Sequence, residues 1–118
     1  ALAAKGVPRI LFSTGTSTHL EPMARLGYDV LSVDWRIPIA EARARLPGVA
    51  VQGNLDSTLL LGPRDTLLAR VRTMLEAAGH SPGYIFNLGH GIQPPTPVDN
   101  VRAVVEAVHA FRPAGARA

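Results

Sequence analysis

One histidine of this chain stands in a setting that suits contact with a substrate. His90 lies between Gly89 and Gly91 and follows a short apolar run. Glycine lets the backbone turn tightly and leaves a neighbouring side chain accessible. The imidazole group changes charge near neutral pH, which suits an anionic or proton-exchanging substrate. We therefore predict that His90 binds substrate.

Polar side chains follow each of the four apolar runs in the chain. They are Ser13, Thr14 and Thr16 after the first run, Asp34 with Trp35 after the second, Gln52, Asn54 and Asp56 after the third, and Asn87 with His90 after the fourth. The carboxyl ends of parallel strands form one rim, where α/β folds bind their ligands. Four such clusters predict a binding site at that rim.

A purely structural role is the alternative for several of these residues. Asp34 is placed to cap the next helix or to pair with Arg36. The Trp35 side chain suits packing better than ligand binding. Asn54 and Asp56 are good turn formers, so a turn role competes with substrate contact. The remaining histidines lie near helix ends or on a helix, where we expect structural or solvated side chains: His19, His80 and His109.

Several common kinds of site are excluded by the sequence. There is no cysteine, which removes disulfides, thiol nucleophiles and thiolate metal ligands. No HExxH pattern occurs, and His90 has no partner at metal-ligand spacing. GxGxxG after the first strand, GxxxxGK[ST] and a GxSxG around Ser13 or Ser17 are also missing. The sequence therefore gives no support for a metal, dinucleotide or P-loop nucleotide site.

The net charge of +3 raises the question of nucleic-acid binding. The charge comes almost wholly from arginine, with Lys5 the only lysine. The arginines are scattered through the helical segments and are not interleaved with aromatic side chains, which argues against a nucleic-acid surface. They include Arg43, Arg45, Arg64, Arg70, Arg72 and Arg102.

Four short apolar runs alternate with amphipathic segments. The runs cover residues 10–12, 30–33, 49–51 and 84–86, and we expect helices over about 21–26, 38–46, 63–78 and 97–111. Pro38, Pro63 and Pro97 mark helix starts, at or near the first helical position. The last two helices carry apolar faces formed by Leu67, Leu68, Val71, Leu75 and Ala78, and by Val101, Val104, Val105, Val108 and Phe111.

This alternation predicts an α/β fold with a parallel sheet covered by helices. Two classes compete, a flavodoxin-like doubly wound sheet and part of a (β/α)8 barrel. The first strands are about 20 residues apart, which favours the barrel. The four units occupy 118 residues, which is about half of the roughly 250 residues that a whole barrel of eight units takes. We expect residues 1–118 to form a single domain or domain segment.

The start of the chain indicates a longer parent protein. Residues 1–6 have the composition of a last helical turn that stops at Gly6, and no initiating methionine is present. An expression boundary would produce the same start. No apolar run approaches the roughly 20 residues that cross a bilayer, and no leader is recognisable. The expected location is the cytoplasm.

Three linked motifs resemble the C-terminal motifs of uroporphyrinogen decarboxylases. They are Val-Asp-Trp at 33–35, Gln-Gly-Asn-Leu-Asp at 52–56 and Ile-Phe-Asn-Leu-Gly-His-Gly-Ile at 85–92, supported by Gly-Tyr-Asp at 27–29 and Ala-Val-His at 107–109. The resemblance implies the C-terminal half of a (β/α)8 TIM barrel, often dimeric. It also implies conversion of the four acetate side chains of uroporphyrinogen III to methyls, giving coproporphyrinogen III without a cofactor.

The resemblance assigns few site residues to this chain. The family's essential carboxylate and substrate-binding arginines belong to N-terminal motifs without a match here, so no catalytic residue is assigned. His90 matches the histidine that contacts the tetrapyrrole. Weaker candidates for binding substrate or shaping the cleft are Ser13, Thr14, Asp34, Gln52 and Asn54. The zinc-dependent methyltransferases of the superfamily hold their metal largely through cysteine and histidine, so a chain without cysteine does not match them.

The leading hypothesis is thus a decarboxylase fragment that is inactive alone. The alternative is a non-catalytic binding chain or one subunit of a split enzyme from the same family. A half-barrel leaves two edge strands and one sheet face uncovered, and we expect such a chain to self-associate.

Overall fold

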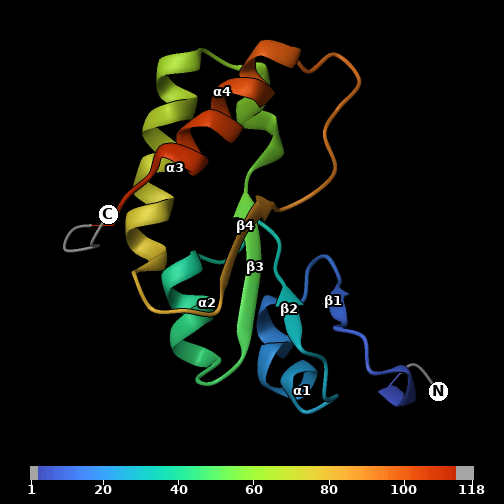
Figure 1. Ribbon diagram of the computed structural model, residues 1–118. Helices are drawn as coiled ribbons and strands as arrows, with labels where there is room; N and C mark the ends of the chain where they lie inside the picture. The colour runs from blue at the N-terminus through green and yellow to red at the C-terminus, as the bar shows by residue number, and fades with distance from the viewer. Residues whose placement is uncertain (1–2, 114–118) are drawn as a thin grey trace.

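The computed structural model describes residues 3–113 of the chain, so Ala1, Leu2 and residues 114–118 lie outside the description. Four parallel strands form one sheet in the order β1-β2-β3-β4 (Figure 1). The strands are β1 (Ile10–Phe12), β2 (Val30–Ser32), β3 (Ala50–Leu55) and β4 (Tyr84–Leu88). The expected parallel α/β sheet is confirmed.

Helices connect the strands in the predicted order. They are α1 (Leu20–Ala24), α2 (Ile39–Arg45), α3 (Arg64–Ala78) and α4 (Val98–Ala110), with 3-10 turns at Ala3–Lys5, Ser17–His19 and Ser57–Leu61. The first turn ends at Gly6, whose φ of +64° suits glycine. In the described part of the chain, no helix has both the length and the apolarity that crossing a membrane would require.

The strand order decides between the two fold classes left open by the sequence. Right-handed connections that always move to the next strand place every helix on the same face of the sheet. A doubly wound sheet instead reverses direction and covers both faces. Figure 1 shows α2 and α3 together on one side of β3. The sequential order therefore excludes the flavodoxin-like arrangement.

Two apolar clusters join the helices to this covered face. Alternate strand positions point to one side, so Leu31, Val51 and Leu55 all face the helices. The first cluster lies beneath α1 and α2 and includes Leu20, Val33, Ile37, Ile39, Ala42 and Leu46. The second lies between α3, α4 and the end of β3 and includes Leu60, Leu67, Val71, Leu75 and Val104.

The other face of the sheet carries no helix among the described residues. We call it the inner face and define it by Ile10, Phe12, Ser32, Gln52, Ile85 and Asn87, which occupy the alternate strand positions. Its large apolar members are exposed, with Ile10 at 49%, Phe12 at 46% and Ile85 at 43%. The expectation of an uncovered sheet face is confirmed for the described chain.

Two strands are longer than their apolar runs. β3 continues through Gln52 and Asn54 to Leu55, and β4 continues through Asn87 to Leu88. The ladder pairs Asn54 with Asn87 and Leu55 with Leu88. The prediction that these polar residues follow the strands was therefore wrong, because backbone pairing continues where the side chains become polar.

Smaller differences concern the helices. Pro38, Pro63 and Pro97 each lie one residue before the helix, with ψ values of 137°, 137° and 125°. The fixed φ of proline suits this boundary position as well as the first helical one. Val105, expected on the buried face of α4, is 47% exposed, whereas Val104 is buried.

Candidate functional site

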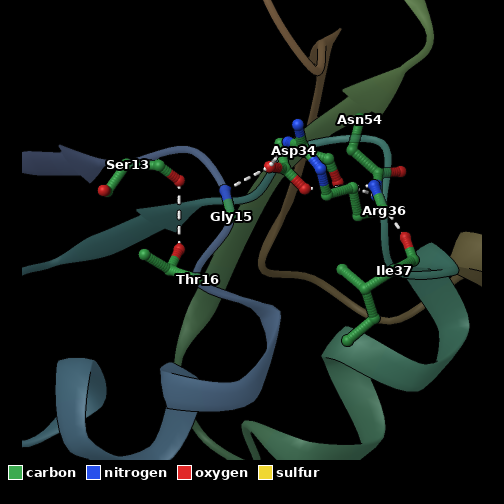
Figure 2. Close-up of polar contacts among 7 residues, drawn as sticks. All are labelled: Ser13, Gly15, Thr16, Asp34, Arg36, Ile37 and Asn54. Atoms are coloured by element: carbon green, nitrogen blue, oxygen red, sulfur yellow. Dashed lines mark hydrogen bonds and ion pairs between the residues drawn. The ribbon is translucent and has the colours of Figure 1, made fainter.

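The candidate site lies where the four strands end. Asp34 connects two of these ends through its carboxylate (Figure 2). The residue is buried, with 3% of its surface exposed. The carboxylate accepts hydrogen bonds from the backbone N–H of Gly15 at 2.6 Å and of Arg36 at 3.0 Å. The Arg36 guanidinium donates a further one at 2.5 Å. The loop after β1 is thereby tied to the turn after β2.

The environment of Asp34 lowers the pKa of its carboxyl. Burial alone would favour the neutral acid, but hydrogen bonds from Gly15 and Arg36 and the charge of Arg36 outweigh it. Asp34 is thus a buried carboxylate whose charge is compensated by the protein itself. This geometry supports the interpretation that Asp34 pairs with Arg36.

Asn54 connects the end of β3 to the same turn. Its side-chain amide donates to the carbonyl oxygen of Asp34 at 2.7 Å and to that of Ile37 at 2.5 Å. The residue is 6% exposed. Both contacts satisfy carbonyl groups that a buried turn would otherwise leave without partners. Asn54 therefore shapes the turn after β2.

Gly89 connects the end of β4. Its backbone N–H donates to the carbonyl of Leu55 at 2.7 Å. A Cβ at this position would stand 2.6 Å from the backbone nitrogen of Trp35 and 3.2 Å from the carbonyl oxygen of Asn54. Only glycine permits this approach, so the turns after β2 and β4 touch through their backbones.

Gly53, within β3, makes a comparable backbone contact. Its φ is +136°, and a Cβ there would lie 2.6 Å from the carbonyl oxygen of Val33. The hydroxyl of Tyr84 donates to the Gly53 carbonyl at 2.7 Å. The middle of β3 is thus fixed by Tyr84 of β4 on one side and by Val33, which follows β2, on the other.

His90 follows Gly89 and is exposed. Its ring meets the ring of Trp35 edge to face, with centroids 5.9 Å apart and planes at 80°. The Arg36 guanidinium lies over the Trp35 ring, 4.2 Å from its centroid. The residues Asp34, Arg36, Trp35 and His90 consequently form one connected row along the rim.

Two hollows border His90. One, of about 380 Å³, opens on the inner face and is lined by Phe12, Ser32, Gln52, Asn87, Leu88, His90 and Gly91. The other, of about 430 Å³, lies over the Ser57–Leu61 turn and is lined by Trp35, Ser57, Thr58, His90, Gly91, Ile92, Gln93 and Pro94. The imidazole is therefore accessible from the inner face and from outside the rim.

The other predicted residues have different surroundings. Gln52 lies on the inner face, where its amide donates to the Ser32 hydroxyl at 3.1 Å. The Ser13 carbonyl accepts from the Thr16 hydroxyl at 3.0 Å, and Thr14 is exposed beside them. Asp56 accepts from the backbone N–H of Thr58 and begins the following 3-10 turn. Its geometry is that of a turn-forming residue.

Sequence reasoning missed two contributors to the hollows. Ser32 lies within the apolar run 30–33, and the signal for it is the lone hydroxyl in Val-Leu-Ser-Val. For Trp35 the sequence favours packing over ligand binding, yet the residue is 38% exposed and contacts His90. Its position next to Asp34 at a strand end was the available signal.

The chemical capacity of the described site is that of a binding surface. It offers an imidazole, the side-chain amides of Gln52 and Asn87, and the hydroxyl of Ser32, beside the apolar side chains of Phe12 and Leu88. Within residues 3–113 no group of three or more metal-ligating His, Asp or Glu side chains occurs. The single buried carboxylate in the row, Asp34, is already bonded to the protein's own donors.

Comparisons with known proteins agree with one another. The family described as uroporphyrinogen decarboxylase (URO-D) matches residues 1–111. The uroporphyrinogen decarboxylase of Anaeromyxobacter dehalogenans is 73% identical over 111 residues, which are 94% of this chain and 32% of that protein. That of Myxococcus xanthus is 51% identical over 109 residues, 92% of this chain and 31% of its own length.

A solved structure is also similar. A methyltransferase from Methanosarcina mazei superposes with a TM-score of 0.79 at 30% identity, covering 92% of this chain and 33% of that one. The chain thus spans about a third of the length of the curated relatives it matches.

The contact at Gly89 predicts unequal effects for two neighbouring substitutions. Gly89→Ala places a Cβ against the backbone of Trp35 and should destabilise the protein by about 2 kcal/mol. Gly91→Ala is the matched control, because a Cβ there meets nothing within 4 Å. Urea unfolding of both variants measures the difference. Equal midpoints would contradict the close backbone contact.

The hydrogen bonds and the ion pair that hold the Asp34 carboxylate predict a loss of stability at acid pH. Its lowered pKa in the folded state means that the ionised carboxyl stabilises the fold above its ordinary pKa. That contribution disappears as the pH falls below about 4 and passes through the lower folded pKa. Asp34→Asn should cost about 2 kcal/mol at pH 7 and reduce the stability lost between pH 5 and pH 2.

Asp99→Asn serves as the comparison for Asp34→Asn. The Asp99 side chain is 73% exposed, and its change should alter the free energy of unfolding by less than about 0.5 kcal/mol. Denaturant midpoints recorded across the pH range provide the measurement. An unchanged acid profile in Asp34→Asn would show that Asp34 does not stabilise the rim.

Proposed function

This chain belongs to the uroporphyrinogen decarboxylase family, and we propose that residues 1–118 form the C-terminal half-barrel of such an enzyme. The observation that carries the proposal is 73% identity to a uroporphyrinogen decarboxylase over a segment that is 32% of that protein. The sequential parallel sheet, with the helices of residues 3–113 on one face, supports a position in the wall of a (β/α)8 barrel. The inner face then borders the barrel interior.

The reaction we assign to the complete enzyme is the decarboxylation of uroporphyrinogen III to coproporphyrinogen III. At each acetate, a proton adds to a pyrrole carbon and the ring takes up positive charge. The bond to the carboxylate then breaks, CO2 leaves, and the electron pair of that bond neutralises the ring. A proton then adds to the exocyclic carbon to complete the methyl group, and the ring carbon releases the proton that it first took up, which restores the pyrrole. The pyrrole ring is its own electron sink, which is why we propose no metal or organic cofactor.

We assign binding of the substrate to this chain, and proton transfer to other parts of the enzyme. The family's essential carboxylate and its substrate-binding arginines have no match here, so we place the chemical step in the remainder of the barrel. We assign His90 to contact with the tetrapyrrole, because its imidazole is exposed at the rim and borders the inner-face hollow. Positive or hydrogen-bonding groups fixed before the reaction stabilise charge without further rearrangement.

The weaker candidates divide by geometry. Gln52 lines the inner-face hollow with Ser32 and is placed to meet substrate polar groups. Asp34 and Asn54 are bonded to the turn after β2, so we assign them to shaping the cleft. Ser13 and Thr14 lie in the loop held by Asp34 and belong to the same supporting group.

Two other functions remain as alternatives within this family. A non-catalytic binding chain or a split-enzyme subunit would keep the same wall and lack turnover without a partner. The similarity to a methyltransferase structure is at 30% identity, well below the 73% identity to a decarboxylase, so a methyltransferase function ranks lower.

We further propose that the complete enzyme is cytoplasmic and forms a homodimer.

The uncovered inner face leads to a prediction for the isolated chain. Ile10, Phe12 and Ile85 are exposed together with the β1 and β4 edges, so the purified chain should self-associate. Phe12→Ser should shift the distribution towards monomer. Sedimentation velocity at several concentrations measures both, and a monomeric parent chain at moderate concentration would contradict the expectation.

A chimera tests the proposed activity. In the Anaeromyxobacter dehalogenans enzyme, the 111 matching residues are replaced by those of this chain. The chimera should convert uroporphyrinogen to coproporphyrinogen, whereas the isolated chain should not. His90→Gln in the chimera should lower kcat/KM about 10- to 100-fold, the effect of losing one hydrogen bond to a charged group.

The controls separate folding from function. Circular dichroism and thermal unfolding establish that the chimera and its His90→Gln variant are folded. His80→Gln changes an exposed histidine that lies after α3 and away from the strand-end rim, and should leave kcat/KM unchanged. A folded but inactive chimera, or a fully active His90→Gln variant, would overturn the respective part of the proposal.

A further inference from the structure

We propose that Trp35 is a positioning residue that sets the orientation of the His90 imidazole, and that Arg36 and Asp34 hold Trp35 in place. The inference rests on the proposed function of His90 as a substrate-binding residue. It concerns a side chain for which the sequence favours packing over ligand binding.

The first observation is the contact between the two rings. His90 is exposed, and the hydrogen bonds found in the described structure do not include one to its imidazole. The contact that defines the ring orientation is therefore the edge-to-face approach to Trp35, at 5.9 Å and 80°. Such pairs prefer a specific mutual angle because the ring edge and ring face carry opposite partial charges.

The second observation is that Trp35 is held more firmly than its exposure suggests. Its indole ring carries the Arg36 guanidinium on one face at 4.2 Å, a cation–π arrangement. That guanidinium is in turn fixed by the buried Asp34 carboxylate at 2.5 Å. An arginine anchored at its charged end cannot swing away freely, so it limits the motion of the indole.

The third observation concerns the backbones. The turn carrying Trp35 and the turn carrying His90 are in contact at Gly89, where a Cβ would lie 2.6 Å from the Trp35 nitrogen. The Asn54 amide donates two further hydrogen bonds to this turn, to the carbonyl oxygens of Asp34 and Ile37. The two aromatic rings therefore project from backbones whose separation is fixed.

These contacts have one consequence for substrate binding. With Trp35 in place, His90 meets the tetrapyrrole without first losing the freedom of an exposed side chain. Without Trp35, the imidazole samples several rotamers and binds less often in the productive one. The expected kinetic signature is a higher KM with a smaller change in kcat.

A double-mutant cycle in the chimera tests this inference. Trp35→Ala should raise KM roughly three- to tenfold, the range that an aromatic edge contact accounts for. Trp35→Phe keeps a ring beside His90 and should stay within about twofold of the parent. In a His90→Gln background, Trp35→Ala should add less than about twofold, because the group that it positions is gone.

Arg36→Met and Val105→Ala complete the design. Arg36→Met removes the guanidinium from both the indole and the buried Asp34 carboxylate, so it should lower the melting temperature. It should also raise KM in the same direction as Trp35→Ala, and this KM effect should appear only when His90 is present. Val105→Ala truncates an exposed apolar side chain on α4 and should leave kinetics and melting temperature unchanged. Thermal unfolding of every variant separates positioning from loss of fold, and Trp35→Phe keeps the test available if Trp35→Ala does not fold.

Each outcome bears on a different claim. If His90→Gln impairs kcat/KM but Trp35→Ala has the same effect with and without His90, the positioning role is overturned and the proposed function stands. If His90→Gln has no effect, the assigned role of His90 falls, and the role of Trp35 falls with it. Strong non-additivity together with rescue by Trp35→Phe supports the inference.

Discussion

The buried carboxylate of Asp34 and the backbone contact at Gly89 together tie the four strand ends into one unit. Through its carboxylate Asp34 holds the loop after β1, and through its carbonyl it receives Asn54 from β3. Gly89 then brings the end of β4 against the residue that follows Asp34. A buried charge destabilises a fold unless it is compensated, and here the donors from Gly15 and Arg36 compensate the Asp34 carboxylate.

This unit explains why the exposed side chains at the rim have defined positions. The loops of an α/β fold are normally its most mobile parts. Here the turn after β2 is closed by a hydrogen bond that the Asp34 carboxylate accepts and by one that the Asn54 amide donates. This turn carries Trp35 and contacts the turn of His90 at Gly89. The helices contribute indirectly, by burying Leu31, Val51 and Leu55 on the covered face and leaving the inner face to the site.

The sequence predicted the elements that local chemistry determines. Apolar runs, helix-starting prolines and the glycines after the helices identified four strand–helix units, and polar residues after each run indicated the rim. The extension of β3 and β4 was not predictable, because the pairing of Asn54 with Asn87 depends on the neighbouring strand and not on side-chain type. Gly89 could be recognised as a turn residue, but its contact with Trp35 exists only once both turns are folded.

The central claim is that the Asp34–Gly89 unit presents His90 to a tetrapyrrole in a complete barrel. The most direct measurement is a crystal structure of the chimera with a coproporphyrin bound as a stable analogue of the product. The account predicts the His90 imidazole within about 3 Å of a ligand polar atom and against the Trp35 ring, as in the described chain. A ligand seated in the barrel without contact to His90, or an imidazole turned away from Trp35, would contradict it.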